Sequence, residues 1–402
     1  MKKLLTLAAA ITLATAASAK ASQKIVSFDP AYKGGIEKSI ESLGGQVTRR
    51  FHLVHAVVAD FPDDVKDASI YTLSGVTHVD EDRYIKWIEA APASMNAVPL
   101  PSVESALGAI RSGEAQWAGS FAGIQPKADP AEAEIPWGVK RVNAAAAWDY
   151  TAGKGVKVAI VDTGMDYTHP DLAAHYKGGY NEVTNTGDPM DDHGHGSHVS
   201  GTIGAVRDGS GVVGIAPEAD LYAVKVLDKN GSGQYSWIVA GIEWAIEHHM
   251  DVINMSLGGK SGTDALAQVM KKAKEAGVTV VCAAGNDSGP VNYPAKYPEA
   301  IAVSASDSSD KLAYFSSKGP EIAVIAPGVN VYSVKKGGGY TSMSGTSMAS
   351  PHVAGLAALA IGAGAHGPDA VRAALTRAAT KLPGLKPTDQ GAGLVDAFKL
   401  VR

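Results

Sequence analysis

The sequence of 402 residues contains one cysteine, Cys282, so no disulfide can form within the chain. Aromatic residues make up only 6% of the chain, and positive charge is not in excess, because 36 basic residues face 41 acidic ones. This balance excludes a chain-wide basic surface for nucleic acid. The hydrophobic content of 45% excludes disorder and collagen, and the single cysteine excludes a disulfide scaffold. We expect a globular protein stabilised by core size or bound ions, with Cys282 as a buried packing residue.

Long hydrophobic runs are also missing. Lys2 and Lys3 precede an apolar stretch from Leu4 to Ala17, which ends in the small-x-small pattern Ala17-Ser18-Ala19. This stretch is shorter than the roughly 20 apolar residues of a transmembrane anchor. It predicts a signal peptide over residues 1–19. The glycine-broken run Val353–Ala365 predicts a buried helix. We therefore expect a secreted, extracellular protein that does not span a membrane.

The first third of the chain divides into two regions that differ in composition and periodicity. Residues 20–87 alternate short strand patterns with helical ones, which predicts a small α+β domain. The expected strands are Lys24–Phe28, Ala56–Phe61 and Val76–Val79, and the expected helices are Ile36–Leu43 and Val65–Leu73. Residues 88–133 are rich in Ala, Pro, Ser and Gly and have weak periodicity, which is typical of a linker.

Residues 134–402 alternate strand patterns with amphipathic helical patterns. The strand patterns are apolar on both faces, as buried parallel strands require. They cover Val156–Val161, Leu221–Val226, Val252–Leu257, Val278–Ala283 and Ala300–Ser304. This order predicts an α/β fold with a doubly wound, mostly parallel sheet. Active groups in such sheets gather at the carboxyl ends of the strands.

Two segments near predicted strand ends carry candidate acid–base chemistry. Asp162 directly follows the first strand and is able to orient an imidazole, although an N-cap aspartate is an equally good interpretation of this residue alone. The segment from Asp191 to Thr202 contains His193, His195 and His198, one of which is a candidate general base. Zinc is the competing interpretation of three close histidines, but the HExxH pattern is absent and no cysteine is near.

Two further segments carry a candidate nucleophile and a candidate hydrogen-bond donor. Ser347 lies where the segment Ser344–Gly355 enters an apolar helix. A serine there either caps the helix or acts as a nucleophile stabilised by the exposed N–H groups. Asn286 follows a buried strand, where its amide is able to donate to an oxyanion; a plain turn is the alternative.

Three strings, taken together and in order, resemble the catalytic motifs of the subtilisin family of serine proteases. They are Asp162-Thr163-Gly164, His195-Gly196-Ser197-His198-Val199 and Gly345-Thr346-Ser347-Met348-Ala349-Ser350-Pro351. The Asp, His, Ser order is the one known for subtilisin itself. The resemblance extends from about Pro136 to Ala397. It implies a serine endopeptidase of broad specificity that works through an acyl-enzyme.

The resemblance also implies a role for each residue. Asp162 orients the imidazole, His195 is the general base and then acid, and Ser347 is the nucleophile. Asn286 supplies the oxyanion-hole side chain. The motif's second histidine, His198, is not catalytic in the family, and we expect His193 to be a solvated loop residue.

Substrate binding is implied by two further segments. Ser256, Leu257 and Gly258 resemble the edge strand on which the family pairs an extended peptide. Asn292 stands in the specificity pocket, where many relatives have glycine. We expect its side chain to exclude very large residues and to favour medium apolar or aromatic residues before the scissile bond.

The family often binds calcium, and the matching residues here all offer oxygen ligands. They are the carboxylates of Asp171 and Asp208 and the carbonyls of Val206, Ser210 and Val212. Hard cations prefer such ligands. A polar loop without an ion is the alternative. The glutamine that completes the site in relatives aligns near Ala133, with Glu132 and Glu134 beside it.

Residues 20–87 resemble the family's inhibitory propeptide, which assists folding and is then removed. The expected partners are therefore polypeptide substrates and the chain's own propeptide, and we expect a self-processing precursor and a monomer. An α/β-hydrolase esterase would need a Gly-x-Ser-x-Gly elbow and the order Ser, Asp, His, but Ala349 replaces the last glycine. An inactive relative serving as a binding protein would lack a triad residue, and all three are present.

Overall fold

The structure is a computed structural model and describes residues 22–32, 34–89 and 135–402. The chain divides into two compact units. Of the described residues, those up to Arg50 and Ala56–Glu81 form the small unit, and Phe51–His55 and those from Asp82 to Arg402 form the large unit. The predicted signal peptide and all of the predicted linker beyond Glu89 lie outside the described residues.

The small unit is a four-stranded antiparallel sheet with the strand order β2-β3-β1-β4 and two short helices. The elements are β1 (Ser22–Phe28), α1 (Ile36–Glu41), β2 (Gln46–Arg50), β3 (Ala56–Phe61), α2 (Asp67–Tyr71) and β4 (Val76–Glu81). Apolar residues of β1, β3 and both helices form its core. Strand β2 was not expected from the sequence, because it is a mostly polar edge strand whose position depends on pairing with β3.

The large unit is built on a nine-stranded sheet with the order β16-β17-β13-β12-β11-β10-β6-β8-β7. All neighbouring pairs are parallel except β16 with β17. The strands are β6 (Lys157–Asp162), β7 (Tyr176–Asn181), β8 (Asp220–Lys225), β10 (Val252–Met255), β11 (Thr279–Ala283), β12 (Ala300–Ser306), β13 (Ile322–Pro327), β16 (Ala379–Thr380) and β17 (Leu394–Val395). The predicted doubly wound, mostly parallel α/β fold is confirmed.

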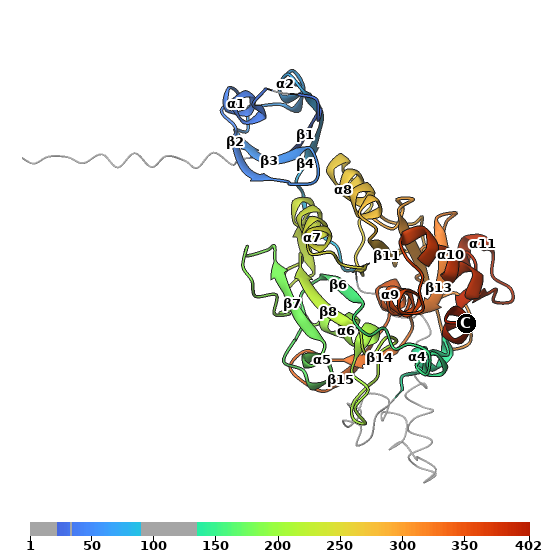
Figure 1. The fold of residues 1–402 in the computed structure, drawn as a ribbon. Coiled ribbons are helices and arrows are strands. Elements are labelled where there is room, and N and C mark those ends of the chain that lie inside the picture. The colour runs from blue at the N-terminus through green and yellow to red at the C-terminus, as the bar shows by residue number, and fades with distance from the viewer. Residues whose placement is uncertain (1–21, 33, 90–134) are drawn as a thin grey trace, which may run out of the picture. The chain divides into compact units, whose positions relative to one another are not determined.

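Helices cover both faces of this sheet. Every residue of β10, β11 and β12 is buried, which requires cover on both sides. The main helices are α6 (His195–Gly204), α7 (Tyr235–Glu247), α8 (Asp264–Glu275), α9 (Thr346–Gly362) and α10 (Pro368–Ala378). Helices α7 and α8 pack together on one side of the sheet and α6 and α9 on the other (Figure 1). Helix α9 is the expected buried apolar helix, and it begins earlier than expected, at Thr346.

Shorter elements connect these layers. They are β5 (Tyr84–Lys86), α4 (Trp137–Arg141), η3 (Ala144–Ala147), α5 (Pro170–Ala173), β9 (Ser232–Gln234), β14 (Val331–Val334), β15 (Tyr340–Met343), α11 (Pro387–Gln390) and α12 (Ala397–Leu400). The two-stranded pairs β5–β9 and β14–β15 lie outside the main sheet. The first of these pairs contributes to the functional site.

The strand order reverses at β6, which has β8 on one side and β10 on the other. The carboxyl end of such a strand is where open α/β sheets bind ligands. Asp162 is the last residue of β6. The fold therefore places this carboxylate at the point where a site is expected.

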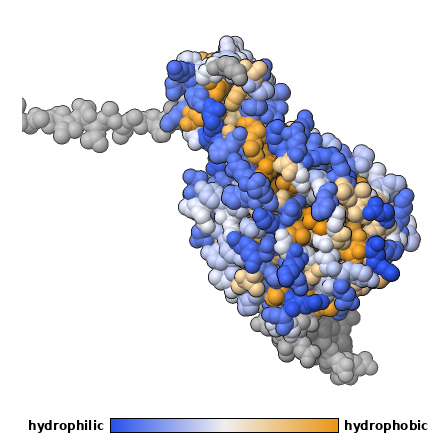
Figure 2. All heavy atoms as spheres, in the orientation of Figure 1, coloured by the Kyte–Doolittle hydropathy of each residue, from blue (hydrophilic) through white to orange (hydrophobic). Residues whose placement is uncertain are grey.

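The distribution of polar and apolar residues between surface and core is the one expected from the composition. On the face seen in Figure 2, polar and charged residues cover much of the large unit, interspersed with groups of hydrophobic residues. Cys282 lies on β11 and is buried, as expected, and this burial raises the pKa of its thiol. Within residues 22–32, 34–89 and 135–402, no helix is both long and apolar enough to cross a membrane.

Candidate active site

A buried aspartate and histidine form the centre of the site. Asp162 ends β6, and His195 is the first residue of α6. Oδ1 of Asp162 lies 2.8 Å from Nδ1 of His195. Burial disfavours the imidazolium, but the charge and hydrogen bond of Asp162 outweigh this and raise the pKa of His195. Nε2 of His195 is buried and has no hydrogen-bond partner among the described residues.

Asp191 fixes the position of His195, although sequence reasoning assigned it no role. Its Oδ1 accepts hydrogen bonds from the hydroxyl of Thr163 and from two loop N–H groups. Its Oδ2 accepts from both the N–H and the hydroxyl of Ser197 in the first turn of α6. One carboxylate thus joins the end of β6 to the start of α6. The available signal was an aspartate shortly before a glycine-rich helix start.

Ser347 is the second residue of α9, and Ser256 holds it in place. Pro351 has no N–H to donate to the carbonyl of Ser347 four residues earlier. The hydroxyl of Ser256 donates to that carbonyl instead, at 2.8 Å. The hydroxyl of Ser347 donates in return to the carbonyl of Ser256, at 3.1 Å. In this structure the Ser347 hydroxyl is therefore engaged with Ser256, and Nε2 of His195 remains unbonded.

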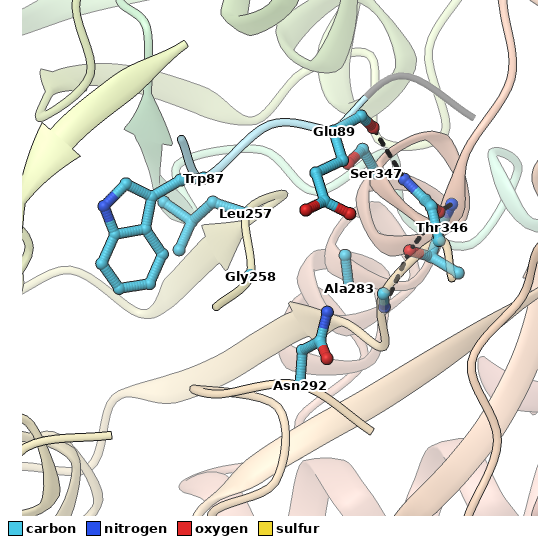
Figure 3. A pocket seen from close by; sticks show the side chains of 10 residues that line it. Trp87, Glu89, Leu257, Gly258, Ala283, Asn292, Thr346 and Ser347 are labelled. Carbon is cyan, nitrogen blue, oxygen red and sulfur yellow. Dashed lines mark hydrogen bonds between the residues drawn. The ribbon is translucent and has the colours of Figure 1, made fainter. Parts of the chain in front are cut away.

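Asn286 follows β11 and presents its amide nitrogen to a carbonyl of the same chain. Its Oδ1 accepts from the N–H and the hydroxyl of Thr346, at 2.8 and 2.9 Å, at the start of α9. This orients Nδ2 outward, where it donates to the carbonyl of Glu89 at 3.2 Å (Figure 3). The side chains of Asn286 and Ser347 therefore lie beside one bound backbone carbonyl.

The segment Asp82–Glu89, which we call the strap, lies against the expected substrate-binding edge. Its strand β5 pairs antiparallel with β9. The N–H groups of Trp87 and Ile88 donate to the carbonyl of Gly231, at 3.0 and 3.2 Å, and the N–H of Gly258 donates to the carbonyl of Trp87, at 3.1 Å. Ile88 and Glu89, which the sequence led us to place in the linker, continue this extended chain.

Trp87 anchors the strap. Its side chain is 2% exposed, its Nε1 donates to the carbonyl of Gly233 at 2.9 Å, and its ring packs edge-on against Tyr235. Sequence reasoning missed this contact, because its partners lie more than 140 residues away along the chain. The predicted residues Leu257, Gly258 and Asn292 line the adjoining pocket together with Ser347.

The predicted calcium ligands are brought together on two segments. The N–H of Val206 donates to the carbonyl of Asp171, and the N–H of Val212 donates to its Oδ2 at 2.9 Å. Burial, with repulsion from Asp208, raises the pKa of Asp171. Asp208 itself accepts from the N–H and hydroxyl of Ser210. The part of the chain that the structure describes holds no group of three or more His, Cys, Asp or Glu side chains suited to a metal.

The other two histidines of the segment Asp191–Thr202 are His198, in the motif, and His193, just outside it, whose ring lies edge-on to that of His195 with the centroids 6.2 Å apart. Nε2 of His198 lies 2.9 Å from the carbonyl of Val331, and burial lowers the pKa of His198 to about 3. This histidine is therefore neutral and structural. His193 is exposed, in agreement with the expected loop position. The position near Ala133, with Glu132 and Glu134, lies outside the described residues.

Comparison with known proteins identifies relatives for most of the large unit. Residues 153–394 match the sequence model of the Subtilase family. The chain is 53% identical over 233 residues to subtilisin amylosacchariticus of Bacillus subtilis subsp. amylosacchariticus, covering 56% of this chain and 60% of that protein. It is 52% identical over 233 residues to subtilisin E of Bacillus subtilis (strain 168), with the same coverage. It is 48% identical over 236 residues to an intracellular serine protease of Paenibacillus polymyxa, covering 56% of this chain and 72% of that protein. The match thus spans about three fifths of the length of the two subtilisins.

Proposed function

This chain belongs to the subtilase family, and on that premise we propose that it is a serine endopeptidase that hydrolyses peptide bonds with broad specificity through Asp162, His195 and Ser347. One observation carries the proposal. The carbonyl of Glu89, in an extended strap, accepts a hydrogen bond from Asn286 in a pocket that Ser347 also lines. A peptide backbone thus already lies beside the proposed nucleophile.

The proposed reaction begins when the hydroxyl of Ser347 leaves the carbonyl of Ser256 and turns to the unbonded Nε2 of His195. Oγ attacks the substrate carbonyl carbon while Nε2 takes its proton, and the charge of Asp162 stabilises the imidazolium. The tetrahedral intermediate collapses, the C–N bond breaks, and His195 returns the proton to the leaving amine. Water then attacks the acyl-enzyme by the same route and releases the carboxylate.

Two donors stabilise the negative oxygen of the tetrahedral intermediate. Nδ2 of Asn286 is the first, and its contact with the Glu89 carbonyl supports this role. The second is the N–H of Ser347, which lies in the first turn of α9 and so has no acceptor within the helix. The partial positive charge at the start of this 17-residue helix acts in the same direction.

Asn286→Ala tests the proposal. We expect kcat for a peptide anilide to fall by about 10²–10³, the magnitude known for the equivalent change in subtilisin, with KM nearly unchanged. The reason is that Nδ2 gains interaction energy mainly when charge develops on the oxygen. Steady-state kinetics of wild type and variant give the split. Equal kcat values in two folded proteins of similar melting temperature would remove Asn286 from the mechanism.

We extend the proposal to the precursor. Residues 1–19 would direct secretion, residues 20–87 would act as an inhibitory propeptide and folding aid, and residues 134–402 would form the monomeric peptidase domain. The processing site would lie in the linker of residues 88–133. The pairing of β5 with β9 supports occlusion of the cleft by the chain itself. A folding aid is useful here because a parallel sheet forms distant contacts before they stabilise anything. The partners would be polypeptide substrates and the propeptide.

Calcium is the proposed structural ion of this extracellular enzyme. The donor set fits, because Asp171 is a buried carboxylate whose pKa is raised by burial and by Asp208, and a divalent cation would relieve both effects. Asp171, Asp208 and the carbonyls of Val206, Ser210 and Val212 would hold it. The ion would supply stability by bridging α5 to the loop after α6, and it takes no part in the reaction.

Removal of calcium is expected to lower the melting temperature by on the order of 5–10 °C, if the ion is present at about 100 times its dissociation constant. In Asp171→Asn the melting temperature should respond weakly to calcium or chelator, because one charged ligand is gone. The exposed Asp149→Asn is the matched control and should respond like wild type. Calorimetry with and without chelator provides the measurement. A wild type indifferent to chelator would contradict the site.

A further inference from the structure

We infer that the specificity pocket selects glutamate, with glutamine next, at the residue before the cut bond, rather than the apolar or aromatic residue expected from the sequence. This inference rests on the proposed protease function and names its substrate class. It comes from the side chain that the chain itself places in the pocket.

The register of the strap identifies Glu89 as the residue before the cut. Trp87 is bonded through its N–H, its carbonyl and its indole nitrogen, so the strap has little freedom to slide. Two residues later, the carbonyl of Glu89 is the one that Asn286 binds. A carbonyl at this donor is the one that the proposed nucleophile attacks. The peptide bond after Glu89 is therefore the bond in the reacting position.

The side chain of Glu89 enters the specificity pocket. Figure 3 shows it pointing from the strap toward Ala283 and Asn292, with Leu257 and Gly258 on the opposite side. This pocket is formed by the segment that follows β10 and by the segments that follow β11. A carboxyl-ended side chain thus occupies the place for which the sequence predicted an apolar group.

The side chain of Asn292 makes the pocket shallow and gives it a polar floor. Its side chain is largely buried, and its Oδ1 accepts from Nζ of Lys260 at 3.4 Å, which turns Nδ2 toward the pocket. A Cβ at Gly285 would lie 2.5 Å from that Nδ2, and one at Gly258 would lie 3.6 Å from it. The amide of Asn292 therefore fills the space between Gly258 and Gly285. An aromatic ring that entered the pocket would collide with this amide.

Two oppositely charged side chains, Lys260 and Asp287, pair beside the pocket. Lys260 lines a second hollow that also contains Glu89 and Asn292. The ammonium of Lys260 pairs with Asp287, which is held in turn by the hydroxyl of Ser317. Asp287 is thereby neutralised, so its charge does not dominate the pocket mouth. A side chain that ends in an acceptor would find an amide donor within the pocket lining, whereas an apolar side chain would leave that donor without a partner.

Peptide anilides of sequence Lys-Trp-Ile-X, which copy the strap, test the inference with the processed enzyme. We expect kcat/KM for X = Glu to exceed that for X = Phe by at least about tenfold, with Gln between them. Asn292→Gly removes the donor and opens the floor, so it should reverse this order. Asn185→Gly makes the same substitution at an exposed turn residue outside the pocket lining, and this control should keep the wild-type order.

The outcomes separate this inference from the function on which it rests. Hydrolysis of Phe as fast as Glu by the wild type, or an unchanged order in Asn292→Gly, would overturn the inference and leave the protease function intact. Absence of hydrolysis of every peptide and of casein would instead contradict the protease function itself.

Discussion

Ser347→Ala is expected to lower kcat for peptide substrates by about a millionfold, the magnitude known for the nucleophile of subtilisin. Without Oγ no acyl-enzyme forms, and only the oxyanion donors and substrate binding remain to accelerate hydrolysis. The fold should survive, because Ser256 continues to donate to the backbone carbonyl of residue 347. Steady-state kinetics and thermal unfolding of the variant give the two measurements.

Ser342→Ala is the matched control for this loss. Ser342 is exposed on β15, close to Ser347 in sequence but outside the proposed site. It should retain wild-type kinetics. A folded Ser347→Ala protein with activity near that of Ser342→Ala would show that another residue performs the nucleophilic attack.

Asp162→Asn is expected to lower kcat/KM by about 10⁴. The buried carboxylate accepts from Nδ1 of His195, at 2.8 Å, and this leaves Nε2 free to take a proton. An asparagine amide is able to donate to Nδ1 instead, which would place the proton on Nε2 and block its role as base. The variant should bind substrate with nearly unchanged KM, because Asp162 lies behind His195.

The same variant should move the acid limb of the pH profile. In wild type, burial disfavours the imidazolium, but Asp162 outweighs it and raises the pKa of His195 above its ordinary value of about 6.5. The base must be neutral, so wild-type kcat/KM falls as the pH drops below this raised value. In Asp162→Asn burial is opposed only by the charge of Asp191, the smallest of the influences on His195, so the acid limb should shift to lower pH. An acid limb that stays in place, as in the control Asp149→Asn, would contradict the pairing.

The sequence predicted the central sheet well, because its buried parallel strands are apolar on both faces. The five predicted strands appear as β6, β8, β10, β11 and β12, with ends shifted by one or two residues. The edge strand β7 escaped notice, because Tyr176–Asn181 is polar and contains two glycines. Such a strand is defined by pairing with β8 rather than by its own pattern.

The candidate site residues also fall into two groups, those that could be identified from the sequence and those that could not. Asp162, His195 and Ser347 lie in sequence motifs whose order is recognisable, so they were identified from the sequence. The strap and Asp191 act through contacts that no local pattern reveals. The carbonyl of Glu89 meets Asn286 across 197 positions of the chain, and Ser256 meets Ser347 across 91. Such contacts between distant residues can be identified only from the three-dimensional structure.

Comparison of intact masses after expression of the full chain, as wild type and as Ser347→Ala, tests the central claim most directly. Wild type is expected to release an N-terminal fragment that ends at Glu89, while Ser347→Ala stays joined across this bond. A fragment with the same end in both proteins would contradict the account, because the cut would then not depend on Ser347.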